Sequence, residues 1–107
     1  MSLDVWLTNP GGEQVYEANI THNLTKMAAE AGIYIYCWHP DRAGCRLACE
    51  ISGPIRKALA LMKADPPRFE KFNSPNGWGL YEHFVPWLER YLEALEEHPK
   101  ATIETST

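Results

Sequence analysis

The sequence has no long apolar run and no excess of positive charge. No apolar run within its 107 residues approaches the length of ~20 residues that a membrane-spanning helix needs. The formal net charge of -4 argues against binding a nucleic-acid backbone, which requires a basic face. The N-terminus also lacks a basic segment followed by an apolar one. We therefore expect a cytoplasmic protein whose partners include neither nucleic acid nor membrane.

Cysteine is scarce, and the common catalytic motifs are absent. The chain has three cysteines, Cys37, Cys45 and Cys49, and this odd number predicts free thiols in a reducing compartment. Together with His39 they resemble a set of zinc ligands, but no Cys-x-x-Cys pair is present. We find no G-x-S-x-G, P-loop, G-x-G-x-x-G or H-E-x-x-H pattern either. The sequence therefore predicts no metal and no cofactor.

The residues that are present predict one α+β domain. No repeat, low-complexity tract or linker divides residues 1–107, and an apolar fraction of 45% suits a single core. Residues 4–8 and 14–20 alternate like strands across the Pro-Gly-Gly turn at 9–12, which predicts a β-hairpin. Residues 101–105 predict a third strand at the edge of this hairpin. The expected sheet is small and antiparallel.

Helical periodicity follows the hairpin. At Thr21 the apolar spacing changes to that of a helix and continues to Ala31, with Gly32 placed to end the helix. A second helix is expected to start at residues 52–54, where a proline suits the first helical position. A short helix is expected at residues 68–72. With a last helix near the C-terminus, the prediction is three to four helices packed on one face of the sheet.

Two segments leave alternatives open. Residues 33–38 have the composition of a strand, but they are also short enough to form an additional helical turn. The last helix has a continuous apolar face that is interrupted by Pro86. Either this helix begins near Val85, or it continues through Pro86 with a kink that costs about 3 kcal/mol. Its apolar residues are Tyr81, Val85, Leu88, Leu92 and Leu95.

One segment at the strand-to-helix junction concentrates polar side chains. Asn19, Thr21, His22 and Asn23 occupy four of five consecutive positions. Thr21 or Asn23 can cap the helix by accepting a hydrogen bond from a backbone N–H group. The alternative is a ligand site, because free N–H groups at a helix N-terminus attract anions. His22 is the natural acid–base residue, since the reference pKa of histidine, ~6.5, is close to neutrality.

A second segment, residues 76–81, has an unusual aromatic residue. Trp78 lies between two glycines after a turn, so its ring either fills the core or lines a pocket. Glu82 and His83 follow closely enough to face the same cavity. We expect this segment to meet the first one in space. The candidate ligand-binding residues are Asn19, Thr21, His22, Asn23, Asn76, Trp78 and Tyr81.

Several short stretches together resemble a family of short uncharacterised proteins of bacteriophages, prophages and bacteria. They are A-N-I-T-H-N-L, K-M-A, A-G-I-Y, W-H-P and N-G-W-G-L-Y-E, and they span about residues 16–101. Such proteins usually carry arginine in place of His39 and generally lack the three cysteines. They often have Glu, Lys or Ala at positions 35 and 36, which favours a helical turn there. The resemblance implies an accessory role, such as interference with a host system from the host cytoplasm.

The first functional hypothesis is a non-enzymatic binding protein. It would hold a small polar ligand or a host protein in a groove between residues 19–23 and 76–81. The concentration of Asn, Thr, His and Trp outside the apolar pattern motivates this hypothesis.

Two other classes of function remain open. One is a small hydrolase-like enzyme with His22 as general acid and base, and with Asn19 or Asn23 orienting the substrate. The other is a structural or oligomeric module that uses Trp87 and Tyr91 on an exposed helix face. The sequence leaves the oligomeric state undetermined.

Overall fold

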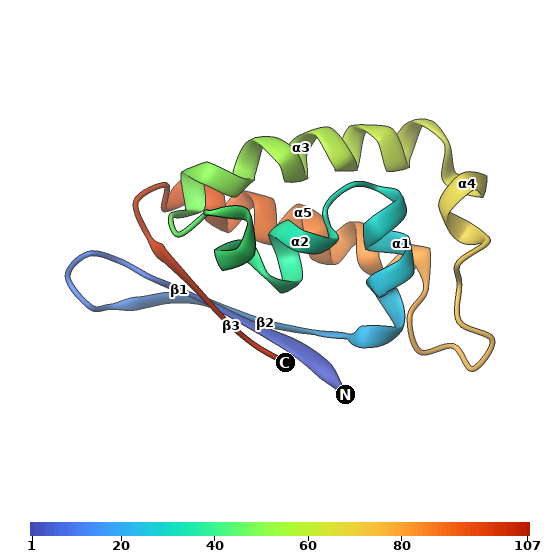
Figure 1. Ribbon diagram of the computed structural model, residues 1–107. Helices are drawn as coiled ribbons and strands as arrows, with labels where there is room; N and C mark the ends of the chain where they lie inside the picture. The colour runs from blue at the N-terminus through green and yellow to red at the C-terminus, as the bar shows by residue number, and fades with distance from the viewer.

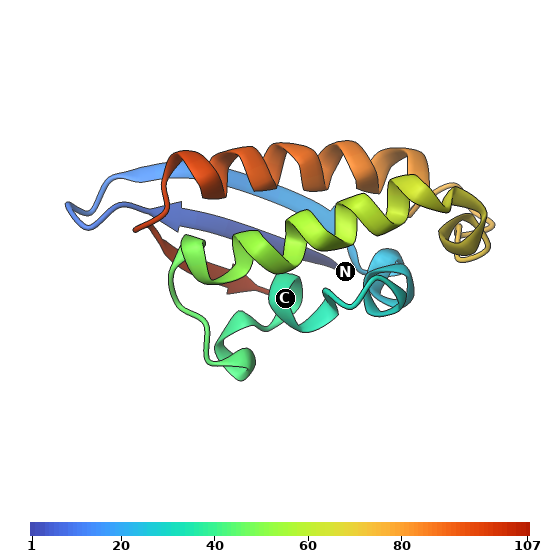
Figure 2. The same cartoon turned by 90° about the horizontal axis from the view of Figure 1, so that it is seen from above.

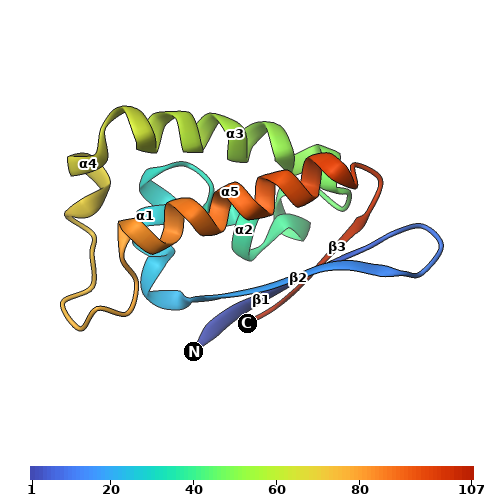
Figure 3. The same cartoon turned by 180° about the vertical axis from the view of Figure 1, so that it is seen from behind.

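A three-stranded antiparallel sheet lies beneath a layer of helices in the computed structural model, which describes all 107 residues (Figure 1). β1 (Ser2–Thr8) is the central strand, flanked by β2 (Gln14–Thr21) and β3 (Thr102–Ser106). The helices all cover the same face of the sheet (Figures 1 and 3). The predicted α+β class is therefore confirmed, although β3 begins one residue later than expected.

Alternation along β1 determines which face of the sheet is covered. Leu3, Val5 and Leu7 are fully buried beneath the helices, whereas Asp4 and Trp6 are partly exposed on the other face. Side chains of a strand point alternately to the two faces, so this pattern defines one core face and one open face. The hairpin turn follows the prediction, with Gly12 at a φ of 91°.

Five α-helices form the second layer. Two of them, α3 (Ala48–Ala64) and α5 (Tyr81–Glu97), are long, run next to each other above the sheet and pack against each other (Figure 2). The short α1 (Thr25–Glu30) and α2 (Tyr34–Trp38) lie beside this pair, and α4 (Pro66–Glu70) follows the end of α3 (Figures 1 and 2). The chain also has 3₁₀ turns at His22–Leu24 and Pro40–Ala43.

The segment with two open alternatives, residues 33–38, forms the helix α2. In a strand, Ile33, Ile35 and Cys37 would share one face. In the structure Ile33 and Cys37 are buried, four residues apart, while Ile35 is 37% exposed. The adjacent Trp38 is also buried, so a helical turn places more apolar surface in the core than a strand would.

The predicted start of the second helix was wrong. The helix α3 begins at Ala48 rather than at residues 52–54. A carboxylate oxygen of Glu50 accepts hydrogen bonds from the backbone N–H groups of Arg46 (3.0 Å) and Leu47 (2.8 Å). These bonds satisfy donors just before the helix and hold the pKa of Glu50 below its usual value.

Both long helices contain an internal proline. Pro54 lies inside α3, where its missing N–H leaves the carbonyl of Glu50 without its helical partner. The thiol of Cys45 lies 4.0 Å from that carbonyl oxygen and donates to it weakly. The helix α5 runs from Tyr81 to Glu97 and so continues through Pro86, rather than beginning near Val85.

The expected exposed aromatic face of the last helix does not exist. Trp87 and Tyr91 are both buried, at 4% and 0% exposure. The indole N–H of Trp87 donates to the backbone oxygen of Asn19 (3.0 Å), and Tyr91 stacks on Tyr16 with 5.9 Å between ring centroids. These residues join α5 to β2 and are not available to a partner.

No helix in the structure has the length and apolar character to cross a membrane.

Candidate ligand groove

A groove of roughly 690 Å³ lies between the junction that follows β2 and the loop that precedes α5. These two segments lie at the same end of the molecule in both side views (Figures 1 and 3). Five of the candidate residues line the groove, so the two segments do meet. The lining side chains with polar groups or aromatic rings are Ser2, Asn19, Thr21, Asn23, Asn76, Trp78 and His83.

The loop before α5 is held together by its own hydrogen bonds. The side-chain oxygen of Asn76 accepts from the hydroxyl of Ser74 (2.6 Å) and from the backbone N–H of Trp78 (2.9 Å). The backbone N–H of Ser74 donates to the carbonyl of Gly79 (3.1 Å). Asn76 therefore fixes the conformation of the backbone that carries Trp78.

A close approach joins this loop to the junction after β2. The side-chain amide of Asn23 donates to the backbone oxygen of Trp78 (2.7 Å). Gly79 has a φ of 115°, and a Cβ atom at this position would lie 2.8 Å from the Cβ of Asn23. Only glycine combines this backbone conformation with this contact. The hydroxyl of Thr21 caps the adjacent turn by accepting from the N–H of Asn23 (3.2 Å), which confirms the capping role predicted for Thr21.

The side chain of Asn19 is oriented by β1. Its amide nitrogen donates to the hydroxyl of Ser2 (2.9 Å) and to a carboxylate oxygen of Asp4 (2.7 Å). The side-chain oxygen of Asn19 has no partner within the protein. Asn19 therefore offers an oriented acceptor at the edge of the groove.

Trp78 lines the groove and does not fill the core. Its side chain is 71% exposed, although the neighbouring Gly79 is buried. Among the large hydrophobic residues, only the terminal Met1 is more exposed. The structure thus resolves the two interpretations of Trp78 in favour of the pocket lining.

His22 does not line the groove, which corrects one prediction. Its Nδ1 accepts a hydrogen bond from the indole N–H of Trp38 (2.8 Å), while its Nε2 is buried and has no partner. Because Nδ1 is an acceptor, the ring proton of neutral His22 is on Nε2. The imidazole lines a separate cavity with Tyr34, Trp38 and His39, so it is not placed to act on a molecule in the groove.

Tyr81 is the second candidate that lies elsewhere. Its hydroxyl donates to the backbone oxygen of Met62 (2.8 Å) and so joins the start of α5 to α3. Glu82 is also absent from the groove, whereas His83 lines it. Met1 and Ser2 also line the groove without a signal in the sequence, because Ser2 pairs with Thr21 in the sheet. β1 begins two residues earlier than the alternation predicts, and this extension forms the pairing.

The groove is polar but nearly without charge. No Lys, Arg, Asp or Glu side chain lines it, and His83 is its only titratable side chain. The N-terminal residue Met1 also borders it. The groove therefore presents mainly neutral hydrogen-bonding groups and an indole ring.

The cysteines do not form a metal centre. No three His, Cys, Asp or Glu side chains are arranged to hold a metal ion. Cys37 is buried, and burial raises the pKa of its thiol from 9.0 to about 12. A thiol that keeps its proton at neutral pH is a poor metal ligand.

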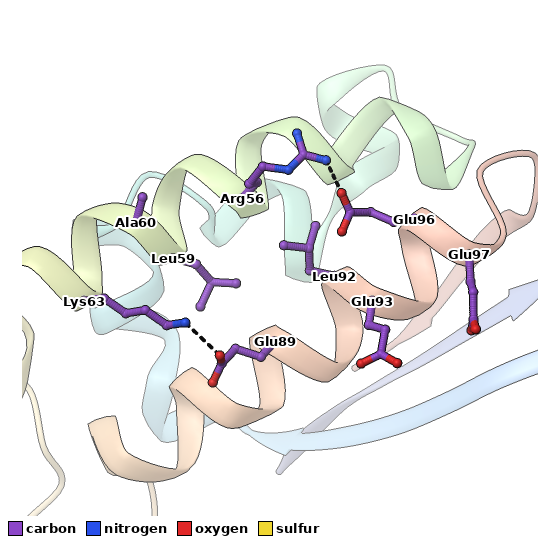
Figure 4. A pocket seen from close by; sticks show the side chains of 9 residues that line it. All are labelled: Arg56, Leu59, Ala60, Lys63, Glu89, Leu92, Glu93, Glu96 and Glu97. Atoms are coloured by element: carbon purple, nitrogen blue, oxygen red, sulfur yellow. Dashed lines mark hydrogen bonds and ion pairs between the residues drawn. The ribbon is translucent and has the colours of Figure 1, made fainter.

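A larger groove, of roughly 710 Å³, follows the line of contact between α3 and α5 (Figure 4). Two ion pairs cross it, Arg56 with Glu96 and Lys63 with Glu89, the second at 2.7 Å. Leu59 forms part of its apolar floor. These contacts join the two helices, so helix packing accounts for this feature without a ligand.

Comparison of the chain with protein-family models, with curated proteins and with solved structures finds no match. The resemblance to short phage and bacterial proteins therefore stays a prediction.

Proposed function

We propose that the protein is a non-enzymatic, phage-type accessory protein that binds a small polar ligand in the groove between residues 19–23 and 76–79. The observation that carries this proposal is the 71% exposure of Trp78 on a loop fixed by its own hydrogen bonds. An indole held in water contributes little to folding, but it loses this exposed surface when a ligand covers it.

The size of the groove favours a small molecule over a host protein. Its volume of roughly 690 Å³ falls within the ~300–1,000 Å³ range that is typical of small-molecule sites. Polar side chains converge on it from two segments that are bonded to each other through Asn23 and Trp78. A site that is formed before the ligand arrives loses less entropy on binding.

The chemistry of the groove favours binding over catalysis. General acid–base catalysis requires positioned titratable groups, and His83 is the only such side chain here. His22 lies outside this groove and lines a separate cavity. In a phage, binding alone would be sufficient for a function, because it removes the ligand from use by the host.

Retention of small molecules tests this proposal. The purified protein is incubated with a protein-free bacterial extract, washed by ultrafiltration and denatured, and the released compounds are identified by mass spectrometry. We expect the wild type to retain at least one compound. The variant Trp78→Ala should retain about tenfold less of that compound, because it has lost a stacking contact.

The matched control is Leu61→Ala, which removes an exposed apolar side chain outside the groove. This variant should retain the same compounds as the wild type. Equal retention by Trp78→Ala, or no retention by the wild type, would overturn the proposed function.

A further inference from the structure

We infer that the ligand of the groove is an uncharged, flat heterocycle of the nucleobase type, stacked on Trp78 and bonded along its edge to Asn19 and Asn76. This inference rests on the proposed function and specifies the class of its ligand. Three features of the groove support it: the exposed ring, the pattern of free donors and acceptors, and the absence of charged side chains.

The ring of Trp78 is available as a stacking platform. The ring is largely exposed, and the backbone of Trp78 is held at its N–H group by Asn76 and at its carbonyl oxygen by Asn23. Flat heterocycles stack on such a ring through their faces, whichever atoms they carry at their edges. The loop conformation is set before binding, so ordering of the backbone adds little cost.

The side-chain amides of Asn19 and Asn76 leave different groups free, because each amide already binds the protein through one of its two polar groups. Asn76 uses its oxygen inside the loop, so its NH₂ group remains as a donor. Asn19 uses its NH₂ group to bind Ser2 and Asp4, so its oxygen remains as an acceptor. These two amides thus offer one fixed donor and one fixed acceptor, in addition to the remaining capacity of Asn23, the hydroxyls of Ser2 and Thr21 and the imidazole of His83.

Fixed donors and acceptors match the edge of a nucleobase. An adenine edge presents an exocyclic NH₂ donor next to a ring-nitrogen acceptor, which asparagine groups can recognise. A sugar hydroxyl rotates and serves as either donor or acceptor, so it does not need such a division. The pattern therefore favours a base over a pyranose.

The groove has no side chain suited to a phosphate. Phosphate recognition uses Arg or Lys, and neither lines the groove. A nucleoside and its monophosphate should thus bind with similar affinity, through the base that they share. This prediction separates the base from the phosphate as the recognised group.

Titration by NMR tests the inference. The indole N–H signal of Trp78, assigned by its loss in Trp78→Ala, is followed with adenosine, guanosine, cytidine, uridine, AMP and methyl glucopyranoside. We expect at least one nucleoside to shift this signal in a saturable way. If adenosine is among them, AMP should bind within about threefold of it, and the pyranoside should cause no shift.

Asn76→Asp is the sharpest variant. It keeps the oxygen that accepts from Ser74 and Trp78 but replaces the free NH₂ donor with an acceptor. We expect the nucleoside to bind it at least about tenfold more weakly, as for the loss of one edge contact. Leu61→Ala should bind like the wild type.

Three outcomes would overturn the inference: no binding of any nucleoside, binding of AMP without binding of adenosine, or binding of the pyranoside alone. The proposed function survives each of these if the extract experiment still gives a compound whose retention depends on Trp78. If retention of compounds from the extract does not depend on Trp78, both the proposed function and this inference are wrong.

Discussion

At the scale of single residues, the groove depends on the contact between Gly79 and Asn23. This contact allows the amide of Asn23 to reach the backbone of Trp78. Gly77, two residues earlier, also has a positive φ (79°), but a Cβ atom there would meet open space. A substitution at Gly77 would therefore cause backbone strain alone, whereas one at Gly79 would cause both strain and a steric contact.

This difference gives a graded prediction for Gly→Ala substitutions. Gly11→Ala introduces neither strain nor contact, so we expect a change in the free energy of unfolding below about 0.5 kcal/mol. Gly77→Ala introduces strain alone and should cost about 1 kcal/mol. Gly79→Ala adds the collision with Asn23 and should cost about 2–3 kcal/mol.

Urea unfolding of the three variants and the wild type measures these free energies. Equal effects of Gly77→Ala and Gly79→Ala would show that the contact with Asn23 does not restrict position 79. The variant at Gly11 is the control for substitution in a loop.

At the scale of secondary-structure elements, burial of apolar side chains determined the conformation of residues 33–38, for which local propensity allowed either a strand or a helical turn. The helix α2 forms because it buries Cys37 and Trp38, and its formation brings the indole of Trp38 to His22. The helix α5 shows that apolar spacing alone is a partial guide. Val85, Leu88 and Leu95 of its predicted apolar face are buried, but Trp87 and Tyr91, which were expected on an exposed face, are buried as well.

The contribution of ion pairs and apolar contacts between α3 and α5 can be measured separately. Lys63 and Glu89 are each about half exposed, at 52% and 47%, so their ion pair is screened by water. We expect Lys63→Met to change the free energy of unfolding by less than about 1 kcal/mol. Leu59 is buried at the same contact, and Leu59→Ala should cost about 2–4 kcal/mol.

Thermal and urea unfolding at low and high salt would check this pair of values. A cost above 2 kcal/mol for Lys63→Met would mean that the ion pair, rather than the leucine, holds these helices together. A cost that disappears in high salt would identify its electrostatic part.

At the scale of the whole molecule, one core contains two ionisable groups. Cys37 and Tyr91 are fully buried, and burial raises the pKa of both. The thiol ionises at about 12 in the folded protein, against an ordinary value of 9.0. The charged forms of these groups are therefore compatible only with the unfolded chain.

We predict a loss of stability in alkali that begins near pH 9. Above this pH the unfolded chain releases the proton of Cys37 while the folded protein retains it, so the free energy of unfolding falls as pH rises toward 12. The slope for this one proton is about 1.4 kcal/mol per pH unit once the unfolded thiol is ionised. Tyr91 adds to the slope above pH 10.

Urea unfolding between pH 8 and pH 10.5 in the presence of a reductant tests this prediction. Cys37→Ala should reduce the slope between pH 9 and pH 10. Cys49→Ala, which removes an exposed thiol, should leave it unchanged. An unchanged slope in Cys37→Ala would show that the buried thiol does not couple folding to pH.

Part of the candidate site could be predicted from sequence because its signals are local. Asn19, Asn23 and Trp78 are polar or aromatic residues outside the apolar pattern of the sequence, and all three line the groove. His22 and Tyr81 had the same kind of local signal, but their partners, Trp38 and Met62, lie far away in the chain. The spacing of residue types along the sequence does not indicate contacts between such distant positions.

The sequence by itself determined the hairpin, its turn and part of the buried face of α5. These depend on alternation, on the backbone freedom of glycine and on helical period, all of which act within a few residues. Only the tertiary structure decided that α2 is a helix, that α3 begins at Ala48, and which polar residues face the groove. The reason is that burial and hydrogen bonding between distant segments outweigh local preferences that differ by less than about 1 kcal/mol per residue.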